Sequence, residues 1–223
     1  MDNKAPGGKG VRSLFLIAAV GAGLVIFAVT AGAVASGSTE AFDRGALLAL
    51  RTPGDLSQPI GPDWLPDAAR EMTALGGTPF LTLLTIVLAG FFAARREGGK
   101  IAILLAAVIG QTLLSHYLKD LFGRPRPDIV PHLVDISSKS FPSGHATSAA
   151  AVYLTLAALI AREINERAVR LYVYFVAMVL ALLIGASRVY LGVHYPTDVI
   201  GGLSFGAAWA ATVLIAARKL QQR

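Results

Sequence analysis

Six runs of apolar residues, each free of Asp, Glu, Lys and Arg, restrict how this chain can fold. They are residues 13–35, 79–94, 101–118, 146–161, 171–186 and 199–217. A helix satisfies its backbone polar groups internally in lipid, and about 20 apolar residues span the hydrocarbon layer. Several runs hold only 16 residues, so the polar residues that flank them must extend the helices. The sequence predicts an all-α, integral membrane bundle of six transmembrane helices in a single domain, residues 1–223.

The overall composition supports a membrane protein and argues against two other classes. Hydrophobic residues make up 54% of the chain and charged residues 15%, with a mean hydropathy of +0.60, which is too apolar for a soluble domain of this size. The net charge of +6 raises the question of nucleic-acid binding, but the basic residues are scattered in short connections rather than gathered in a stripe. The chain has no Cys, so it can form neither a disulfide nor a thiolate metal site.

Basic residues in the connections predict which side of the membrane each connection faces. The N-terminus, the second and fourth connections and the C-terminal tail each carry three Lys or Arg residues. Cytoplasmic loops are enriched in these residues, so we expect both termini in the cytoplasm, as in a multi-pass protein of a bacterial inner membrane. The third and fifth connections then face the periplasm or the exterior. The four basic residues of the third connection oppose this bias, and a site there explains them better.

The first apolar run has a second interpretation, as a cleaved signal peptide. Basic residues precede it, and Ala33-Val34-Ala35 resembles a signal-peptidase site. Its 23 residues exceed the usual length of the apolar part of a signal peptide, which favours a retained anchor. Cleavage would leave the topology of the later helices unchanged.

The segment 36–77, between the first two runs, is rich in Gly, Pro and Asp. Apolar residues recur at helical spacing from Phe42 to Leu50 and again from Trp64 to Leu75. We expect helices that lie in the headgroup plane on the extracytoplasmic side, with Trp64 as an interfacial anchor. A lid or lipid entrance and an ordinary connecting loop are both compatible with this pattern.

Three short polar clusters stand at the ends of apolar runs, where ionisable groups near the membrane point to function. The first holds Lys119 and, seven residues later, Arg126 between two prolines. A helix end and a rigid loop can aim these two cations at one anion, and the arginine fork can bind two phosphoryl oxygens. Basic residues at a membrane edge also extend to lipid headgroups, and Arg124 and Lys139 are interpreted in that way.

The second cluster, Pro142-Ser143-Gly144-His145, opens the fourth run. Ser143 fits a helix N-cap, and Gly144 lets an anionic ligand approach the main chain at the helix N-terminus. His145 would stand where it can protonate a leaving oxygen. A plain helix cap with a surface histidine is an equally compatible interpretation.

The third cluster places Arg188 at the end of the fifth run, His194 in the following turn and Asp198 four residues later. A carboxylate at that spacing can accept a hydrogen bond from one ring nitrogen and leave the lone pair of the other free to attack. Such a pair also occurs on plain protein surfaces. The three clusters nevertheless fall on one side of the membrane and complement one another as nucleophile, acid and oxyanion clamp, so we predict a phosphoryl-transfer site.

The same residues resemble the signature of the type 2 phosphatidic acid phosphatases, membrane relatives of glucose-6-phosphatase and the vanadium haloperoxidases. The signature is Lys, six residues, Arg-Pro; then Pro-Ser-Gly-His; then Ser-Arg, five residues, His, three residues, Asp, and residues 119–127, 142–145 and 187–198 match it without departure. The match covers residues 119–198 and is specific for the family, but it says little about the substrate.

The resemblance implies a role for each matching residue. His194 would attack phosphorus and form a phosphohistidine, with Asp198 orienting it, and His145 would protonate the leaving group and then activate water. The phosphoryl oxygens would be held by Lys119, Arg126, Arg188, Ser143 and the amide of Gly144. No metal or other cofactor is expected, because three cations take the place of Mg²⁺ and no carboxylate cluster is present to bind one. His116 and His132 fall outside the signature and are interpreted as structural or incidental.

A site at the membrane surface favours a phosphate ester or pyrophosphate whose tail stays in the bilayer. We expect undecaprenyl diphosphate first, with phosphatidylglycerophosphate, phosphatidic acid and lipid A 1-phosphate as alternatives. A lipid phosphotransferase would use the same residues. The apolar runs disfavour a soluble, vanadate-holding haloperoxidase, and a transporter would carry ionisable groups near mid-span rather than at the helix ends.

Overall fold

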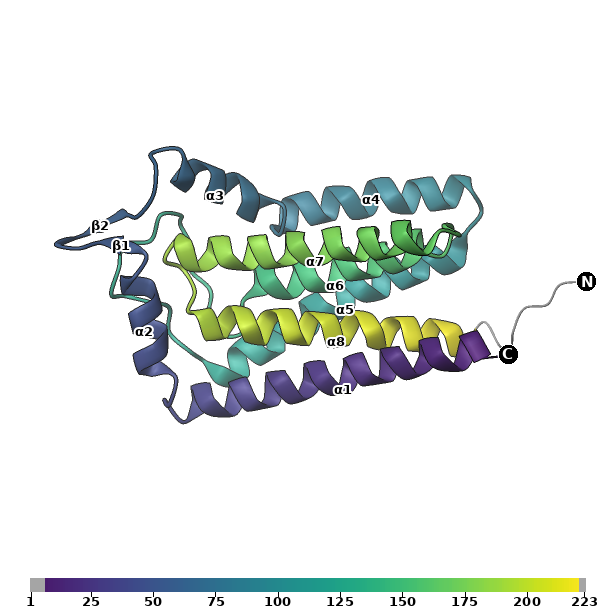
Figure 1. The fold of residues 1–223 in the computed structure, drawn as a ribbon, viewed down its shortest axis with the longest axis horizontal. Coiled ribbons are helices and arrows are strands. Elements are labelled where there is room, and N and C mark those ends of the chain that lie inside the picture. The colour runs from purple at the N-terminus through teal and green to yellow at the C-terminus, as the bar shows by residue number, and fades with distance from the viewer. Residues whose placement is uncertain (1–6, 221–223) are drawn as a thin grey trace, which may run out of the picture.

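The computed structural model describes residues 7–220, with side chains described from Leu14 to Leu220. Helices dominate this part of the chain, and two short strands interrupt them. The elements are α1 (Gly7–Ala35), α2 (Glu40–Leu48), β1 (Arg51–Thr52), β2 (Asp55–Pro59), α3 (Leu65–Ala74), α4 (Thr78–Ala94), α5 (Gly98–Phe122), α6 (Gly144–Ile160), α7 (Arg167–Tyr190) and α8 (Pro196–Leu220). In Figure 1 the longer helices run along the long axis of the molecule, and α2 crosses one end.

Four of the described helices, α1, α5, α7 and α8, are long and apolar enough to cross a membrane. Helices α3 and α4 pass the same test as a pair that is bent by 44°. Helix α6 is apolar but has only 17 residues, fewer than the roughly 20 that a full crossing needs. Each of the six predicted runs coincides with one of these helices. The structure thus holds four or five candidate spans, and the count of six stays a prediction.

Polar residues of the three clusters extend the helices, as the short apolar runs required. Helix α5 includes Lys119, α7 includes Arg188 and α8 includes Asp198. Helix α5 then stops at Gly123, whose φ of 59° is the left-handed conformation that commonly ends a helix. The loop 123–143 therefore begins with a sharp turn, and this turn directs it across the end of the bundle.

Small residues bring α8 close to both α6 and α1. A Cβ on Gly206 in α8 would lie 2.3 Å from the carbonyl oxygen of Thr147 in α6. A Cβ on Gly23 in α1 would lie 2.7 Å from the carbonyl oxygen of Ser204 in α8. Helices in lipid associate through such close backbone contacts, because burial of apolar surface gives little driving force there. The three helices are therefore held together at glycines.

Helix α1 is an integral part of the bundle. The ring of Phe27 lies 5.8 Å from that of Phe141 in the loop before α6, at an interplanar angle of 25°. It also contacts Phe205 in α8 and Phe122 at the end of α5. Such packing supports the interpretation of the first run as a retained anchor.

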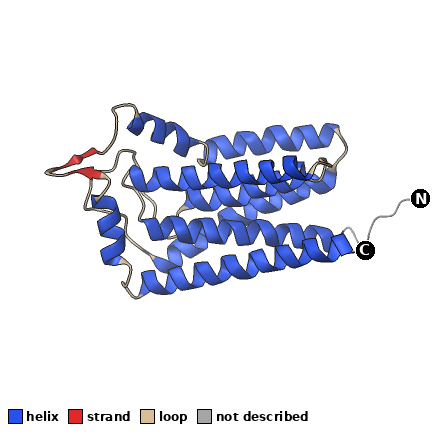
Figure 2. Cartoon of the chain, in the orientation of Figure 1, coloured by secondary structure: helices blue, strands red, loops and turns tan. Residues whose placement is uncertain are grey.

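The segment 36–77 folds at one end of the bundle. It forms α2 and α3, which confirms the two predicted helical stretches, and Trp64 precedes α3 with its side chain exposed. Between them β1 and β2 pair as an antiparallel hairpin, drawn in red in Figure 2. The predicted all-α class therefore did not include this hairpin. The hairpin is tied to the bundle by the buried side chain of Arg51, which donates a hydrogen bond to the carbonyl oxygen of Tyr190 at 3.1 Å.

The contact at Gly206 leads to a prediction about stability. Gly206→Ala forces α6 and α8 apart, and overpacking of this kind costs about 1–3 kcal/mol. The control is Gly21→Ala, because a Cβ at Gly21 would meet nothing within 4 Å. Thermal unfolding in detergent should show a lower midpoint for Gly206→Ala alone. Equal midpoints for the two variants would contradict the close packing.

Candidate active site

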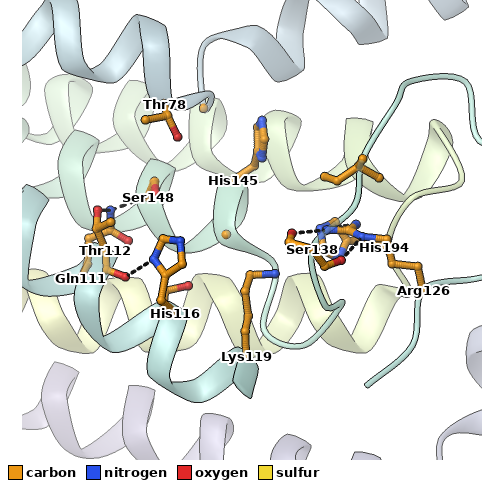
Figure 3. Close-up of a pocket in the computed structure, with 14 residues that line it drawn as sticks. Thr78, Gln111, Thr112, His116, Lys119, Arg126, Ser138, His145, Ser148 and His194 are labelled. Carbon is orange, nitrogen blue, oxygen red and sulfur yellow. Dashed lines mark hydrogen bonds between the residues drawn. The ribbon is translucent and has the colours of Figure 1, made fainter. Parts of the chain in front are cut away.

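One cavity of about 170 Å³ collects residues from all three polar clusters. Among the residues that line it are Lys119, Arg126, Gly144, His145 and His194. They come from the last turn of α5, the loop 123–143, the first turn of α6 and the turn between α7 and α8. Figure 3 shows His194 and Arg126 at one end of the cavity, with Lys119 and His145 nearer its middle.

The ring of His194 is held from both sides. Its Nδ1 lies 3.3 Å from Oδ2 of Asp198, and its Nε2 lies 3.1 Å from Nη1 of Arg126. An arginine can only donate, so Nε2 must be the nitrogen that carries a lone pair, and Nδ1 must carry the hydrogen. This tautomer, inferred from the hydrogen bonds, presents a nucleophilic nitrogen to the cavity.

Burial keeps His194 uncharged. The side chain is 1% exposed. Removal from water lowers the pKa of His194 to about 3, because desolvation outweighs the hydrogen bond and the negative charge of Asp198. The ring is therefore neutral at physiological pH, and Nε2 keeps a lone pair, which accepts the hydrogen bond from Arg126.

Asp198 is fully buried and has more partners than the sequence predicted. One oxygen accepts hydrogen bonds from the hydroxyl of Ser140 and from the backbone amide of Tyr195, the latter at 2.9 Å. The other oxygen pairs with Nη1 of Arg124 at 2.6 Å. These contacts fix the carboxylate, and the carboxylate in turn fixes the ring of His194.

The interpretation of Arg124 as a headgroup-facing residue was wrong. Its side chain is only 14% exposed, and its guanidinium bridges Asp198 and Asp43, with 2.7 Å to Oδ2 of Asp43. Asp43 in α2 is fully buried and also accepts hydrogen bonds from the amide and hydroxyl of Thr197. Two buried carboxylates require a counter-charge, which draws Arg124 inward. Its guanidinium also lies 4.3 Å from the ring centroid of Tyr195.

Arg126 is anchored by carbonyl groups as well as by His194. It donates to the carbonyl oxygens of Ser138, at 2.6 Å, and of Val193. Burial lowers the pKa of Arg126 to about 10, so the guanidinium keeps its charge at neutral pH. The side chain is thus a fixed cation beside the nucleophilic nitrogen. Lys139, in contrast, takes part through its backbone carbonyl, which accepts a hydrogen bond from Lys119.

Arg188 and Ser143 are buried behind the cavity rather than on its wall. Arg188 donates from Nη1 to the hydroxyl of Thr73 at 3.0 Å. Its Nε has no hydrogen-bond partner, and neither has the hydroxyl of Ser143. Ser143 does precede α6 as its N-cap residue, but its side chain makes no capping hydrogen bond. Two buried polar groups close to the start of the predicted site therefore lack a hydrogen-bond partner in the described part of the chain.

The two histidines outside the signature behave differently. His132 contacts the carbonyl oxygen of Pro127 at 2.6 Å, which agrees with a structural role. His116 contacts the carbonyl oxygen of Thr112 at 2.8 Å and also lines the cavity, which the sequence interpretation did not foresee. The sequence did contain a signal, because His116 lies three residues before Lys119 and so falls close to the same helix face.

Comparison with known proteins identifies relatives of the chain. A family model described as the PAP2 superfamily matches residues 100–222. The chain is 40% identical over 188 residues to phosphatidylglycerophosphatase B of Bacillus subtilis, covering 82% of this chain and 86% of that protein. It is 31% identical over 188 residues to lipid A 1-phosphatase of Rhizobium etli, covering 72% of this chain and 77% of that protein.

A solved structure has the same fold. The transmembrane PAP2 type phosphatidylglycerolphosphate phosphatase from Bacillus subtilis superimposes with a TM-score of 0.76 at 33% identity. The alignment covers 90% of this chain and 96% of that one. The arrangement of helices described above is therefore shared with an experimentally determined protein.

The ion pairs of Arg124 predict a large effect of its loss. Arg124→Met leaves Asp43 and Asp198 without a counter-charge, and an uncompensated buried charge costs about 3–5 kcal/mol. The additional change Asp43→Asn should restore part of the stability, because one unpaired charge is removed. Thermal unfolding in detergent measures both effects. Arg44→Met, an exposed neighbour on α2, is the control and should stay within about 0.5 kcal/mol of wild type.

The low pKa of His194 predicts a dependence of stability on pH. Between pH 6.5, the ordinary value, and about 3, the unfolded chain binds a proton here that the folded chain does not. The free energy of unfolding is therefore not reduced by this group above pH 6.5. It decreases as the pH falls from 6.5 towards 3, because protons favour the unfolded chain. The unfolding midpoint should drop less on acidification in His194→Gln than in wild type. Parallel profiles for the two proteins would disagree with a buried, neutral ring.

Proposed function

The chain belongs to the PAP2 superfamily, and from this membership we propose that it is a metal-independent membrane lipid phosphatase that works through a phosphohistidine at His194. The observation that carries the proposal is the lone pair of Nε2. It belongs to a neutral, carboxylate-oriented imidazole, and it faces a cavity lined by Lys119, Arg126 and His145. The relatives of the chain are named as phosphatases of lipid phosphate esters. The chain is a phosphoric monoester hydrolase of the same kind.

The first step transfers the phosphoryl group to the protein. The Nε2 lone pair of His194 attacks phosphorus while the bond from phosphorus to the leaving oxygen breaks. The negative charge of the bound phosphate favours the protonated form of His145. The protonated ring then gives its proton to the leaving oxygen, so the lipid leaves as a neutral alcohol, or as a lipid phosphate if the substrate is a diphosphate. The hydrogen stays on Nδ1 of His194 and is donated to the carboxylate of Asp198, which stabilises the positive charge that forms on the ring.

The second step returns His194 to its starting state. His145, now neutral, takes a proton from a water molecule as the water attacks phosphorus. The bond between phosphorus and Nε2 breaks, inorganic phosphate leaves, and His145 is again protonated. One water is consumed, and no electrons are exchanged with any other group.

Fixed positive charge stabilises both transition states. Lys119 and Arg126 stand on the wall of the cavity, and Arg188 lies behind it with an unpaired Nε. Charge in phosphoryl transfer spreads over the equatorial oxygens, where such cations act. Within residues 7–220 no group of three or more His, Cys, Asp or Glu side chains is placed to hold a metal ion.

We further propose that the six predicted helices all span the membrane, with both termini in the cytoplasm of a bacterium. The chain is a multi-pass membrane protein, as its spans and relatives indicate. The site end carries α2, the hairpin and α3 (Figure 1). The connection between α4 and α5, which carries Arg95, Arg96 and Lys100, is at the opposite end. The positive-inside rule then directs the active site to the periplasm or the exterior.

A phosphate-release assay tests the reaction and its intermediate. Purified protein in excess EDTA should hydrolyse lipids from a panel of phosphatidylglycerophosphate, phosphatidic acid, lipid A 1-phosphate and undecaprenyl diphosphate. His194→Ala should lower turnover by about 10³-fold or more and should remove an acid-labile phosphoprotein that is trapped by rapid quenching.

His132→Gln is the control for the loss of a histidine near the site, and it should keep both the activity and the phosphoprotein. Unchanged turnover in His194→Ala would refute the assigned nucleophile. A requirement for Mg²⁺ would refute the metal-independent reaction.

A further inference from the structure

The cavity continues beyond the catalytic residues along one face of α5. Gln111 and Ser115 line it together with Lys119, and the three positions are spaced four residues apart, so they fall on one helix face. Gln111 lies eight residues before Lys119, about 12 Å along the helix axis. Figure 3 shows Gln111, Thr112 and Ser148 at the end of the cavity away from His194.

This end of the cavity is polar but carries no strong cation. Lys119 and Arg126 are the only Lys or Arg side chains among the described residues that line the cavity. Away from His194 the lining is instead made largely of hydroxyl and amide groups from α4, α5 and α6: Thr78, Gln111, Thr112, Ser115 and Ser148. A second phosphate attached directly to the reacting one would meet no Lys or Arg side chain at this end of the cavity.

The orientation of the Gln111 amide can be deduced from its neighbours. Thr112 donates its hydroxyl hydrogen to the carbonyl oxygen of Val108 at 2.8 Å. Thr112 must therefore accept from Gln111, whose Nε2 lies 2.9 Å from it and 3.0 Å from the hydroxyl of Ser148. Both hydrogens of Nε2 are then used. The remaining atom, Oε1, is an acceptor.

Two polar atoms at this site have no hydrogen-bond partner. They are Oε1 of Gln111 and the hydroxyl of Ser115, on side chains that are 3% and 4% exposed. An unpaired buried polar group costs about 1–3 kcal/mol, and the cost is recovered when a ligand supplies the partner. The acceptor on Gln111 requires a donor, and an ester or a phosphodiester has none to offer.

The geometry of the reaction brings the leaving group to these atoms. Attacking and leaving atoms lie on opposite sides of phosphorus in phosphoryl transfer. With His194 at one end of the cavity and His145 at the leaving oxygen, the alcohol that departs extends toward Gln111 and Ser115.

We propose that Gln111 and Ser115 bind a hydroxyl group of the leaving alcohol, and so select lipid phosphates whose leaving group is a polyol such as glycerol. This inference rests on the proposed phosphatase function. Phosphatidylglycerophosphate has such a leaving group, with a free hydroxyl next to the carbon that bears the reacting phosphate. The diacylglycerol of phosphatidic acid and the polyprenyl phosphate of undecaprenyl diphosphate have none, so this site ranks phosphatidylglycerophosphate above both.

A pair of lipids that differ by one hydroxyl provides the test. Oleoyl lysophosphatidic acid carries a free hydroxyl on the carbon next to the phosphorylated one, and its 2-deoxy analogue lacks only that group. Wild type should show a kcat/KM about tenfold higher for the hydroxylated lipid, as expected for one hydrogen bond to a buried group. Gln111→Leu and, separately, Ser115→Ala should bring the ratio close to one.

The matched control is Thr155→Val, which also removes a buried hydroxyl without a partner but lies outside the cavity. It should keep the wild-type ratio. Equal rates for the two lipids in wild type, or an unchanged ratio in both cavity variants, would overturn the hydroxyl site while leaving the phosphatase function intact. Absence of phosphate release from either lipid, and from the wider panel, would instead refute the proposed function itself.

Discussion

Arg124 joins parts of the chain that are far apart in sequence, and the position of His194 depends on it. Its guanidinium lies between Asp43 and Asp198, both fully buried. Two such carboxylates repel each other strongly at low dielectric. The guanidinium between them attracts both, and these two ion pairs hold α2, the loop after α5 and the start of α8 together. Asp198 then orients the ring of His194. Asp43, in the N-terminal part of the chain, therefore contributes to the alignment of His194 through Arg124 and Asp198.

The helices and the polar clusters could be predicted because their signals are local. A charge-free apolar run indicates a membrane helix without reference to the rest of the chain, and a four-residue interval relates His194 to Asp198. The convergence of the clusters followed from counting connections, since alternate connections face the same side. In the structure, Lys119, Arg126 and His145 line the same cavity as His194.

Other features could not be predicted because they are decided by residues far away in sequence. Asp43 stands among polar residues of a short helix and would be exposed if Arg124, 81 residues later, were not its partner. Gln111 looks like a polar interruption of an apolar run, and its neighbours within the helix do not indicate a cavity. The hairpin has little alternation of polar and apolar residues, and one of its ties to the bundle is the buried Arg51. Burial of a polar side chain is a tertiary property, so local patterns underestimate it.

The close approach of α6 and α8 at Gly206 has a consequence for how enzymes of this kind can diversify. This contact holds the helix that carries His145 in register with the helix that carries Asp198. The wall that meets the departing alcohol belongs to another element, α5, and its composition can change without disturbing that register. Lys119 lies on the same face of α5, so a new substrate range can arise by exchanging Gln111 and Ser115 while Lys119 is kept.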